Sequence, residues 1–123
     1  MKTNVAILVF DDVEVLDFAG PFEVFAVTDE LWDHEPFHTF IVGLAPGSVR
    51  ARNGLKIVPD FTLENCPPPH VLVVPGGAGT RPLLHQPALL EWLRRKSRPA
   101  EIVMSVCTGA LVLAKAGLLD GLR

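Results

Sequence analysis

The chain has 123 residues, of which 49% are hydrophobic and 20% charged, and its formal net charge is −3 at pH 7. This length fits one domain rather than two, so we expect residues 1–123 to form a single domain with a hydrophobic core. The only basic run, residues 94–98, is short and typical of a solvent-facing helix, which argues against nucleic acid as a partner of this segment. The first apolar run is too short for a signal peptide or a membrane span, which predicts a cytoplasmic protein.

Cysteine and histidine usage predicts no metal site and no cofactor. The two cysteines form no CxxC pair, so neither a disulfide framework nor a cysteine zinc site is indicated. The histidines have no metal-ligand spacing and adjoin neither cysteine; they are His34, His38, His70 and His85. We interpret all four as structural or surface residues.

The first part of the chain predicts a strand, a helix and a strand. Residues 5–10 form a continuous apolar run, which is typical of a strand buried on both faces of a parallel sheet. Residues 18–31 predict a helix with Pro21 in its first turn. Its buried face is expected to contain Phe22, Phe25, Ala26 and Leu31. Residues 37–44 predict the second strand.

The remaining segments alternate in the same way. Residues 49–58 predict an antiparallel hairpin around Asn53-Gly54, and residues 66–69 form a rigid connector rich in proline. Strands are expected at 71–74 and 102–106, and helices at 87–95 and 108–116. The first of these helices should bury Leu89, Leu90 and Leu93. This alternation predicts an α/β fold with a parallel sheet, in which ligands bind beyond the carboxyl ends of the strands. The loops after Phe10, Val74 and Val106 therefore carry the candidate site.

Cys107 lies where a strand ends and a helix begins. The unpaired N–H groups of a helix start favour a thiolate and can hold an oxyanion, and Gly109 keeps the backbone close to a ligand. This arrangement resembles a nucleophile elbow with cysteine in place of serine. The alternative is a buried, inert cysteine, which is the commoner fate of a lone cysteine after an apolar strand.

Two further segments have open interpretations. The glycine-rich run at 75–79 either points the amides of Gly76 and Gly77 into a pocket or forms only a tight turn. Asp17 lies between two large apolar residues. If it is buried near Cys107, it can carry a proton for a reaction; on local sequence alone, a helix N-cap is the preferred interpretation. Glu23 is interpreted as helix surface, and a position facing the pocket is the alternative.

Taken together, three motifs resemble the ThiJ/PfpI superfamily, which shares its fold with class I glutamine amidotransferases. They are FDDV at 10–13 followed by LDFAGPFEVF at 16–25, VPGGAG at 74–79, and SVCTGA at 105–110 continuing into LLDG at 118–121. The three motifs occur in the same order as in the family, and together they span nearly the whole chain. The resemblance implies a flavodoxin-like three-layer sandwich, a homodimer, a reactive Cys107 with Asp17 beside its sulfur, and a pocket lined by amides around Gly77 and Thr108.

Within that superfamily, Asp17 and the SVCTG string are most similar to isonitrile hydratase and to the sensor domain of AraC-type transcription regulators. The first resemblance implies an enzyme that hydrates a small-molecule isonitrile, with Cys107, Asp17 and Thr108 as catalytic residues and Gly76, Gly77 and Gly109 as substrate or oxyanion contacts. The second implies a domain that binds a ligand without turnover. A carbonyl- or oxidative-stress protein is the third alternative, although such members usually carry Glu at the position of Asp17.

The resemblance also implies more polypeptide than this sequence contains. Members of the superfamily continue for several strands and helices past the position of Asp120-Gly121, so the chain is expected to be the N-terminal portion of the family domain. A sheet that ends here should expose one edge and an apolar face.

Overall fold

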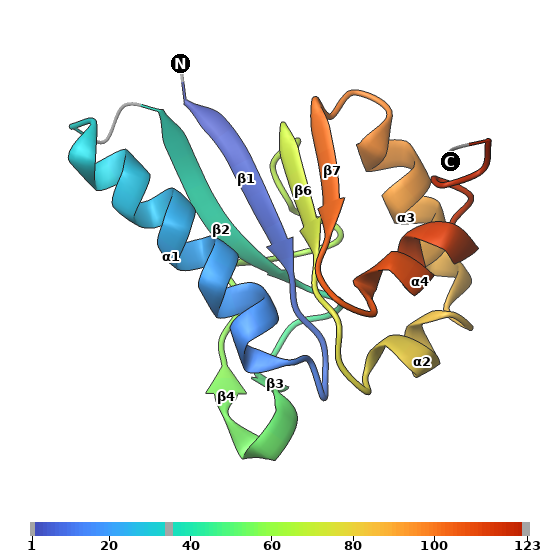
Figure 1. The fold of residues 1–123 in the computed structure, drawn as a ribbon. Helices are drawn as coiled ribbons and strands as arrows, with labels where there is room; N and C mark the ends of the chain where they lie inside the picture. The colour runs from blue at the N-terminus through green and yellow to red at the C-terminus, as the bar shows by residue number, and fades with distance from the viewer. Residues whose placement is uncertain (1, 34–35, 122–123) are drawn as a thin grey trace.

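A parallel sheet of five strands, in the order β5-β2-β1-β6-β7, forms the centre of the molecule (Figure 1). The computed structural model describes residues 2–33 and 36–121. The strands are β1 (Thr3–Leu8), β2 (Phe37–Gly43), β5 (Phe61–Thr62), β6 (Val71–Val74) and β7 (Ile102–Ser105). Their pairings are all parallel.

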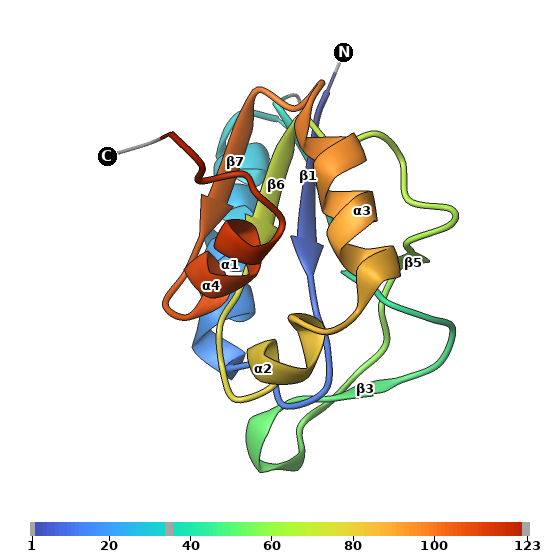
Figure 2. The same ribbon diagram turned by 90° about the vertical axis from the view of Figure 1, so that its right-hand side faces the viewer.

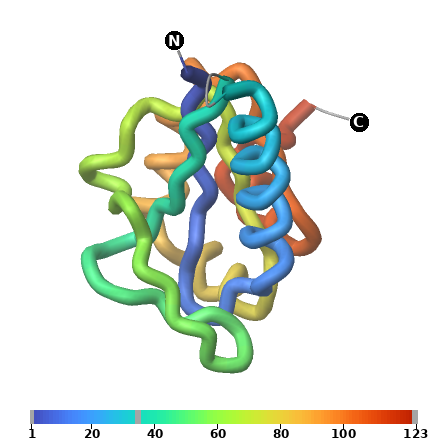
Figure 3. The backbone as a smooth tube through the Cα atoms, turned by 90° about the vertical axis from the view of Figure 1, so that its left-hand side faces the viewer, coloured from blue at the N-terminus to red at the C-terminus, as the bar shows by residue number. Residues whose placement is uncertain are grey.

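Helices cover both faces of this sheet, which makes three layers. Helix α1 (Val15–Leu31) lies on one face, where Figure 3 shows it toward the viewer. Helices α2 (Thr80–Leu83), α3 (Pro87–Ser97) and α4 (Gly109–Lys115) lie on the other, as Figure 2 shows. The predicted α/β, flavodoxin-like class is therefore confirmed.

The two central strands form the core. Residues 5–8 of β1 and all four residues of β6 are buried, as their continuous apolar sequences predict. Each such valine, leucine or isoleucine contributes about 1.5–3 kcal/mol when fully buried. Helix α3 packs Leu89, Leu90 and Leu93 inward, as expected, and adds the buried Trp92.

Strand β7 differs from the central strands because it forms an edge of the sheet. Its residues alternate in exposure, with Ile102 52% and Met104 37% exposed, while Val103 packs against the core. The expectation of an open edge with exposed apolar side chains is confirmed at this strand.

Three expectations about α1 are wrong. The helix begins at Val15, so Pro21 is inside it rather than in its first turn. Glu14, not Asp17, is the N-cap residue, and Asp17 is the third helical residue. Leu31 is 77% exposed, because it lies roughly 220° around the helix from the buried Phe18. Phe22, Phe25 and Ala26 are partly buried, and Glu23 is exposed, as expected.

The predicted hairpin is present between β2 and β6. Strands β3 (Val49–Arg50) and β4 (Lys56–Ile57) pair in antiparallel register. Their loop contains the 3₁₀ turn η1 (Arg52–Gly54), where Asn53 and Gly54 both have positive φ, at 66° and 91°. The asparagine and glycine therefore serve the turn, although the loop is longer than two residues.

Sequence patterns missed the short elements α2 and β5. Four helical residues and two strand residues are too few to show a hydrophobic period. Within residues 2–33 and 36–121, no helix has both the length and the apolar character needed to cross a membrane.

Candidate functional site

The candidate site lies at the carboxyl ends of β1, β6 and β7. The chain leaves β1 toward α1 on one face and leaves β6 toward α2 and α3 on the opposite face (Figure 1). Because the connections leave these neighbouring strands toward opposite faces, a crevice opens at the carboxyl ends of the strands, where α/β folds bind ligands. The loop at 9–14, the glycine loop at 75–79 and the turn at 106–108 meet there.

Cys107 occupies the turn between β7 and α4 in a strained backbone conformation. Its φ is 54°, in the left-handed region that non-glycine residues rarely adopt. The N–H of Val106 still donates to the carbonyl of Val74 (3.0 Å), and the N–H of Gly109 donates to the carbonyl of Val106 (3.0 Å). The thiol is free and the residue is exposed. The predicted elbow backbone is therefore present, and the alternative of a buried cysteine is wrong.

Two glycines allow the elbow to lie directly on the end of β6. A Cβ on Gly109 would collide with the carbonyl oxygen of Val74 and would lie 2.8 Å from that of Pro75. A Cβ on Gly76 would lie 2.7 Å from both the amide nitrogen and the Oγ1 of Thr108. Both positions therefore require glycine because backbone approaches backbone.

Thr108 ties the elbow to the glycine loop. Its Oγ1 accepts a hydrogen bond from the N–H of Gly77 (2.9 Å), and the Thr80 hydroxyl lies 3.5 Å away. Thr80 is buried and its hydroxyl donates to the Gly77 carbonyl (2.8 Å). Sequence analysis missed Thr80, because only its contact across the loop distinguishes it from a helix-start threonine.

Asp17 reaches from α1 to the same loop. Its Oδ2 accepts a hydrogen bond from the N–H of Gly76 (3.1 Å). The N-cap interpretation fails because this carboxylate binds the amide of another segment, not one of its own helix. Within the part of the chain that the structure describes, no hydrogen bond joins Asp17 to the Cys107 thiol.

The amides of the site divide into two groups. Those of Gly76 and Gly77 already donate to Asp17 and Thr108. Among the described residues, no acceptor is hydrogen-bonded to the N–H of Cys107 or Thr108. In an elbow, the amide that follows the nucleophile is the usual oxyanion donor. The elbow therefore carries a free thiol next to two backbone amides that no described residue occupies.

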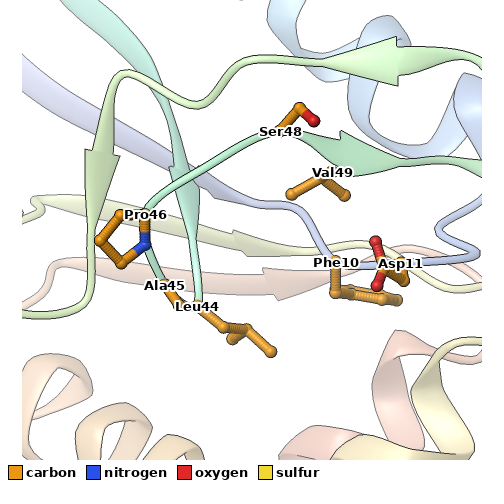
Figure 4. A pocket seen from close by; sticks show the side chains of 7 residues that line it. All are labelled: Phe10, Asp11, Leu44, Ala45, Pro46, Ser48 and Val49. Carbon is orange, nitrogen blue, oxygen red and sulfur yellow. The ribbon is translucent and has the colours of Figure 1, made fainter.

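Two cavities open on the α2 side of this edge. One, of about 230 Å³, is shown in Figure 4 and is lined by Phe10, Asp11, Leu44, Ala45, Pro46, Ser48 and Val49. The other, also of about 230 Å³, shares Phe10, Asp11 and Leu44 with it and extends to Gly79 and Gln86. Cys107 lines neither cavity, so the thiol and these hollows are separate features.

Cys66 and His70 make their contacts outside the three loops of the candidate site. Burial raises the pKa of the Cys66 thiol to about 11, against a smaller opposing effect of Lys96. The Nδ1 of His70 accepts from the N–H of Asn4 (2.8 Å), which is a structural role. His34 lies outside the described residues. Within residues 2–33 and 36–121, no three potential ligand side chains group as a metal site would require.

Comparison with known proteins places the chain in one family. The model of the DJ-1/PfpI family matches residues 3–123, and the chain belongs to that family. A ThiJ/PfpI family protein from Pseudomonas syringae superposes with a TM-score of 0.87 at 32% identity, covering 98% of this chain and 48% of that one.

Two curated relatives differ in what they do. Isonitrile hydratase of Pseudomonas putida is 37% identical over 123 residues, which is all of this chain and 51% of that protein. The HTH-type transcriptional regulator GbdR of Pseudomonas aeruginosa is 29% identical over 118 residues, 96% of this chain and 32% of the regulator. The chain thus spans about half of one relative and about a third of the other.

Proposed function

We propose that the protein adds water to an isonitrile and releases an N-substituted formamide, with Cys107 as nucleophile and Asp17 as proton carrier. The observation that carries this proposal is the free, exposed thiol at a turn with φ of 54°, next to the Asp17–Gly76 contact. The 37% identity with isonitrile hydratase across the whole chain supports the choice of reaction.

The first half of the reaction forms a thioimidate. The Cys107 thiolate attacks the terminal carbon of the isonitrile and forms a C–S bond. Asp17, in its protonated form, delivers a proton to that same carbon, and the Thr108 hydroxyl assists. The product is a covalent S-linked R–N=CH– group, and Asp17 is left as a carboxylate.

The second half hydrolyses this intermediate. Asp17 takes a proton from a water molecule as the water oxygen attacks the thioimidate carbon. Asp17 passes this proton to the nitrogen. It then takes the hydroxyl proton as the C=O bond forms and the C–S bond breaks, so that the Cys107 thiolate leaves, the formamide is released and the protonated Asp17 is restored. The free amides of Cys107 and Thr108 stabilise negative charge as the tetrahedral intermediate breaks down. The backbone at Gly76, Gly77 and Gly109 forms the wall against which the substrate lies.

The direct test is turnover by the purified full-length protein. It is incubated with a simple alkyl isonitrile, and formamide is followed by proton NMR, with Cys107→Ala and Asp17→Asn in parallel. We expect wild-type turnover and none from Cys107→Ala. Asp17→Asn should lose turnover as well, because an amide can neither deliver the proton that forms the thioimidate nor take one from water. Turnover that survives Cys107→Ala would overturn the mechanism.

A second candidate function is a ligand-sensing domain. Its support is the similarity to GbdR, which covers 96% of this chain. In that role, the same loops around Cys107 and Asp17 bind a small molecule without chemical turnover. If the folded full-length protein does not consume isonitrile, this function becomes the preferred one. Calorimetric binding of a nitrogen-containing small molecule that Asp17→Asn weakens would then support it.

We also propose a cytoplasmic homodimer in which α1 contributes to the interface. The outward face of α1 exposes Leu16 (76%), Val24 (64%) and Leu31 (77%), which is unusual for a solvent-facing helix. Light scattering after gel filtration should give a dimer mass for the wild type and a monomer mass for Val24→Asp. A wild-type monomer would contradict this part of the proposal.

A further inference from the structure

The β3–β4 hairpin is attached to the loop that leads into α1. The N–H of Arg50 donates to Asp11 Oδ1 (3.0 Å), and the N–H of Asp12 donates to the carbonyl of Arg50 (2.8 Å). The N–H of Arg52 donates to the carbonyl of Val13 (3.0 Å). Figure 1 places the hairpin next to the first turn of α1. These three hydrogen bonds therefore hold the hairpin against the segment that leads into α1.

The loop ends in a closed ring of hydrogen bonds around Asp17. The N–H of Glu14 donates to the carbonyl of Gly76 (3.0 Å), and the N–H of Gly76 donates to Asp17 Oδ2 (3.1 Å). The N–H of Asp17 donates back to the carbonyl of Glu14 (3.1 Å). Any displacement of Glu14 therefore moves both the Gly76 peptide and the carboxylate that it holds.

The side chain of Glu14 is paired with the hairpin. Arg52 Nη1 lies 3.0 Å from Glu14 Oε2, with side-chain exposures of 63% and 34%. Glu14 and Asp17 are three positions apart at the start of a helix, a separation that makes side chains neighbours and like charges unfavourable. Arg52 therefore offsets a negative charge that would otherwise act on Asp17.

We infer that Arg52 is a positioning residue for the candidate site: by pairing with Glu14, it fixes the Glu14–Gly76–Asp17 ring and thereby holds the Asp17 carboxylate against the Gly76 amide. The catalytic meaning of this inference rests on the proposed function, in which Asp17 carries the proton. The contacts themselves do not depend on that function.

The same hairpin offers a matched control. Arg50 is exposed, and within the described residues its guanidinium has no ion pair. Its side chain can therefore be changed without breaking the Arg52–Glu14 pair.

The test follows hydrogen exchange of the Gly76 amide by NMR in the full-length protein at one fixed pH, with Asp17→Asn as the reference for a lost carboxylate contact. Arg52→Gln should speed this exchange severalfold, because the hairpin then no longer holds the Glu14 side chain. Arg52→Lys should restore most of the wild-type rate. Glu14→Gln should speed the exchange to a similar extent, and adding Arg52→Gln to it should cause little further change.

Several outcomes would overturn the inference. One is an increase in Gly76 exchange in Arg52→Gln no larger than that in Arg50→Gln, and another is a further increase when Arg52→Gln is added to Glu14→Gln. If Arg52→Gln does not fold, as judged by its thermal melt, the faster exchange in Glu14→Gln is still required. If the enzyme turns over isonitrile, Arg52→Gln should lower kcat more than it raises KM, and Arg52→Lys should restore kcat. Absent turnover with the exchange rates as expected would remove the proposed function and leave the positioning role.

Discussion

The two cysteines of this chain place the same side chain in two different environments. Cys66 is buried, its thiol donates to the carbonyl of Pro67 (3.2 Å), and burial raises its pKa to about 11. Cys107 is exposed at a turn with φ of 54°, next to amides that no described group occupies. Each is a lone cysteine in the sequence. The difference therefore comes from backbone conformation and exposure, and the predictions below test it.

The largest expected effect separates the two thiols by activity. Cys107→Ala should lower kcat/KM for an alkyl isonitrile at least a thousandfold, about 4 kcal/mol of transition-state stabilisation, because the nucleophile is lost. Cys66→Ala should stay within about twofold of wild type, since a protonated, buried thiol takes no part. Similar losses in both variants would mean that Cys107 has no special role.

The next test compares their reactivity in the native protein. At pH 8, a thiol with a pKa of about 11 is ionised to roughly one part in a thousand, and the thiolate is the reactive form. Iodoacetamide should therefore modify Cys107 at least a hundred times faster than Cys66, as measured by peptide mass spectrometry over time. In guanidinium chloride, the two rates should converge. Equal native rates would remove the distinction between the two sites.

A backbone substitution should break the elbow without touching either sulfur. Gly109→Ala places a methyl group against the carbonyl of Val74 and should lower the free energy of unfolding by about 2–4 kcal/mol. Gly20→Ala is the control, because nothing lies within 4 Å of its Cβ position. That helix substitution should raise stability by about 0.5–1 kcal/mol. Urea denaturation measures both, and comparable effects would contradict the close packing of the elbow.

The smallest effect concerns the stability that the buried Cys66 confers. Burial favours the protonated thiol, so the folded protein keeps this proton up to about pH 11, whereas the unfolded chain releases it from about pH 9. The free energy of unfolding should fall across this window by at most about 1.4 kcal/mol per pH unit. In Cys66→Val, this component should be missing, while the difference between the two proteins stays constant below pH 8. Parallel urea curves from pH 7 to pH 11 would contradict the burial argument.

The fold was largely predictable from the sequence because its strongest elements have continuous patterns. The runs at 5–10 and 71–74 predicted central strands, and PALLEWLRR predicted α3 with its buried leucines. The Asn53-Gly54 pair predicted the hairpin. The elbow at Cys107 followed from its place between a strand and a small-residue helix.

The predictions that were wrong concern details set by contacts between segments that are far apart in the sequence. The start of α1 was misplaced because the Glu14 N–H binds Gly76, and no local pattern records that bond. Asp17 was assigned to a cap because its partner is 59 positions away. Likewise, Arg52 was an ordinary hairpin residue until the structure paired it with Glu14.

The location of the site across the β1–β6 pair has a consequence for folding kinetics. These neighbouring strands are far apart in sequence, and pairings of that kind form slowly because a long loop must close first. The Asp17–Gly76 contact cannot exist before that closure. A chain that has formed α1, α4 and the hairpin but has not yet paired β1 with β6 therefore still lacks the assembled site. Completion of the site is a late folding event that reports on correct sheet formation.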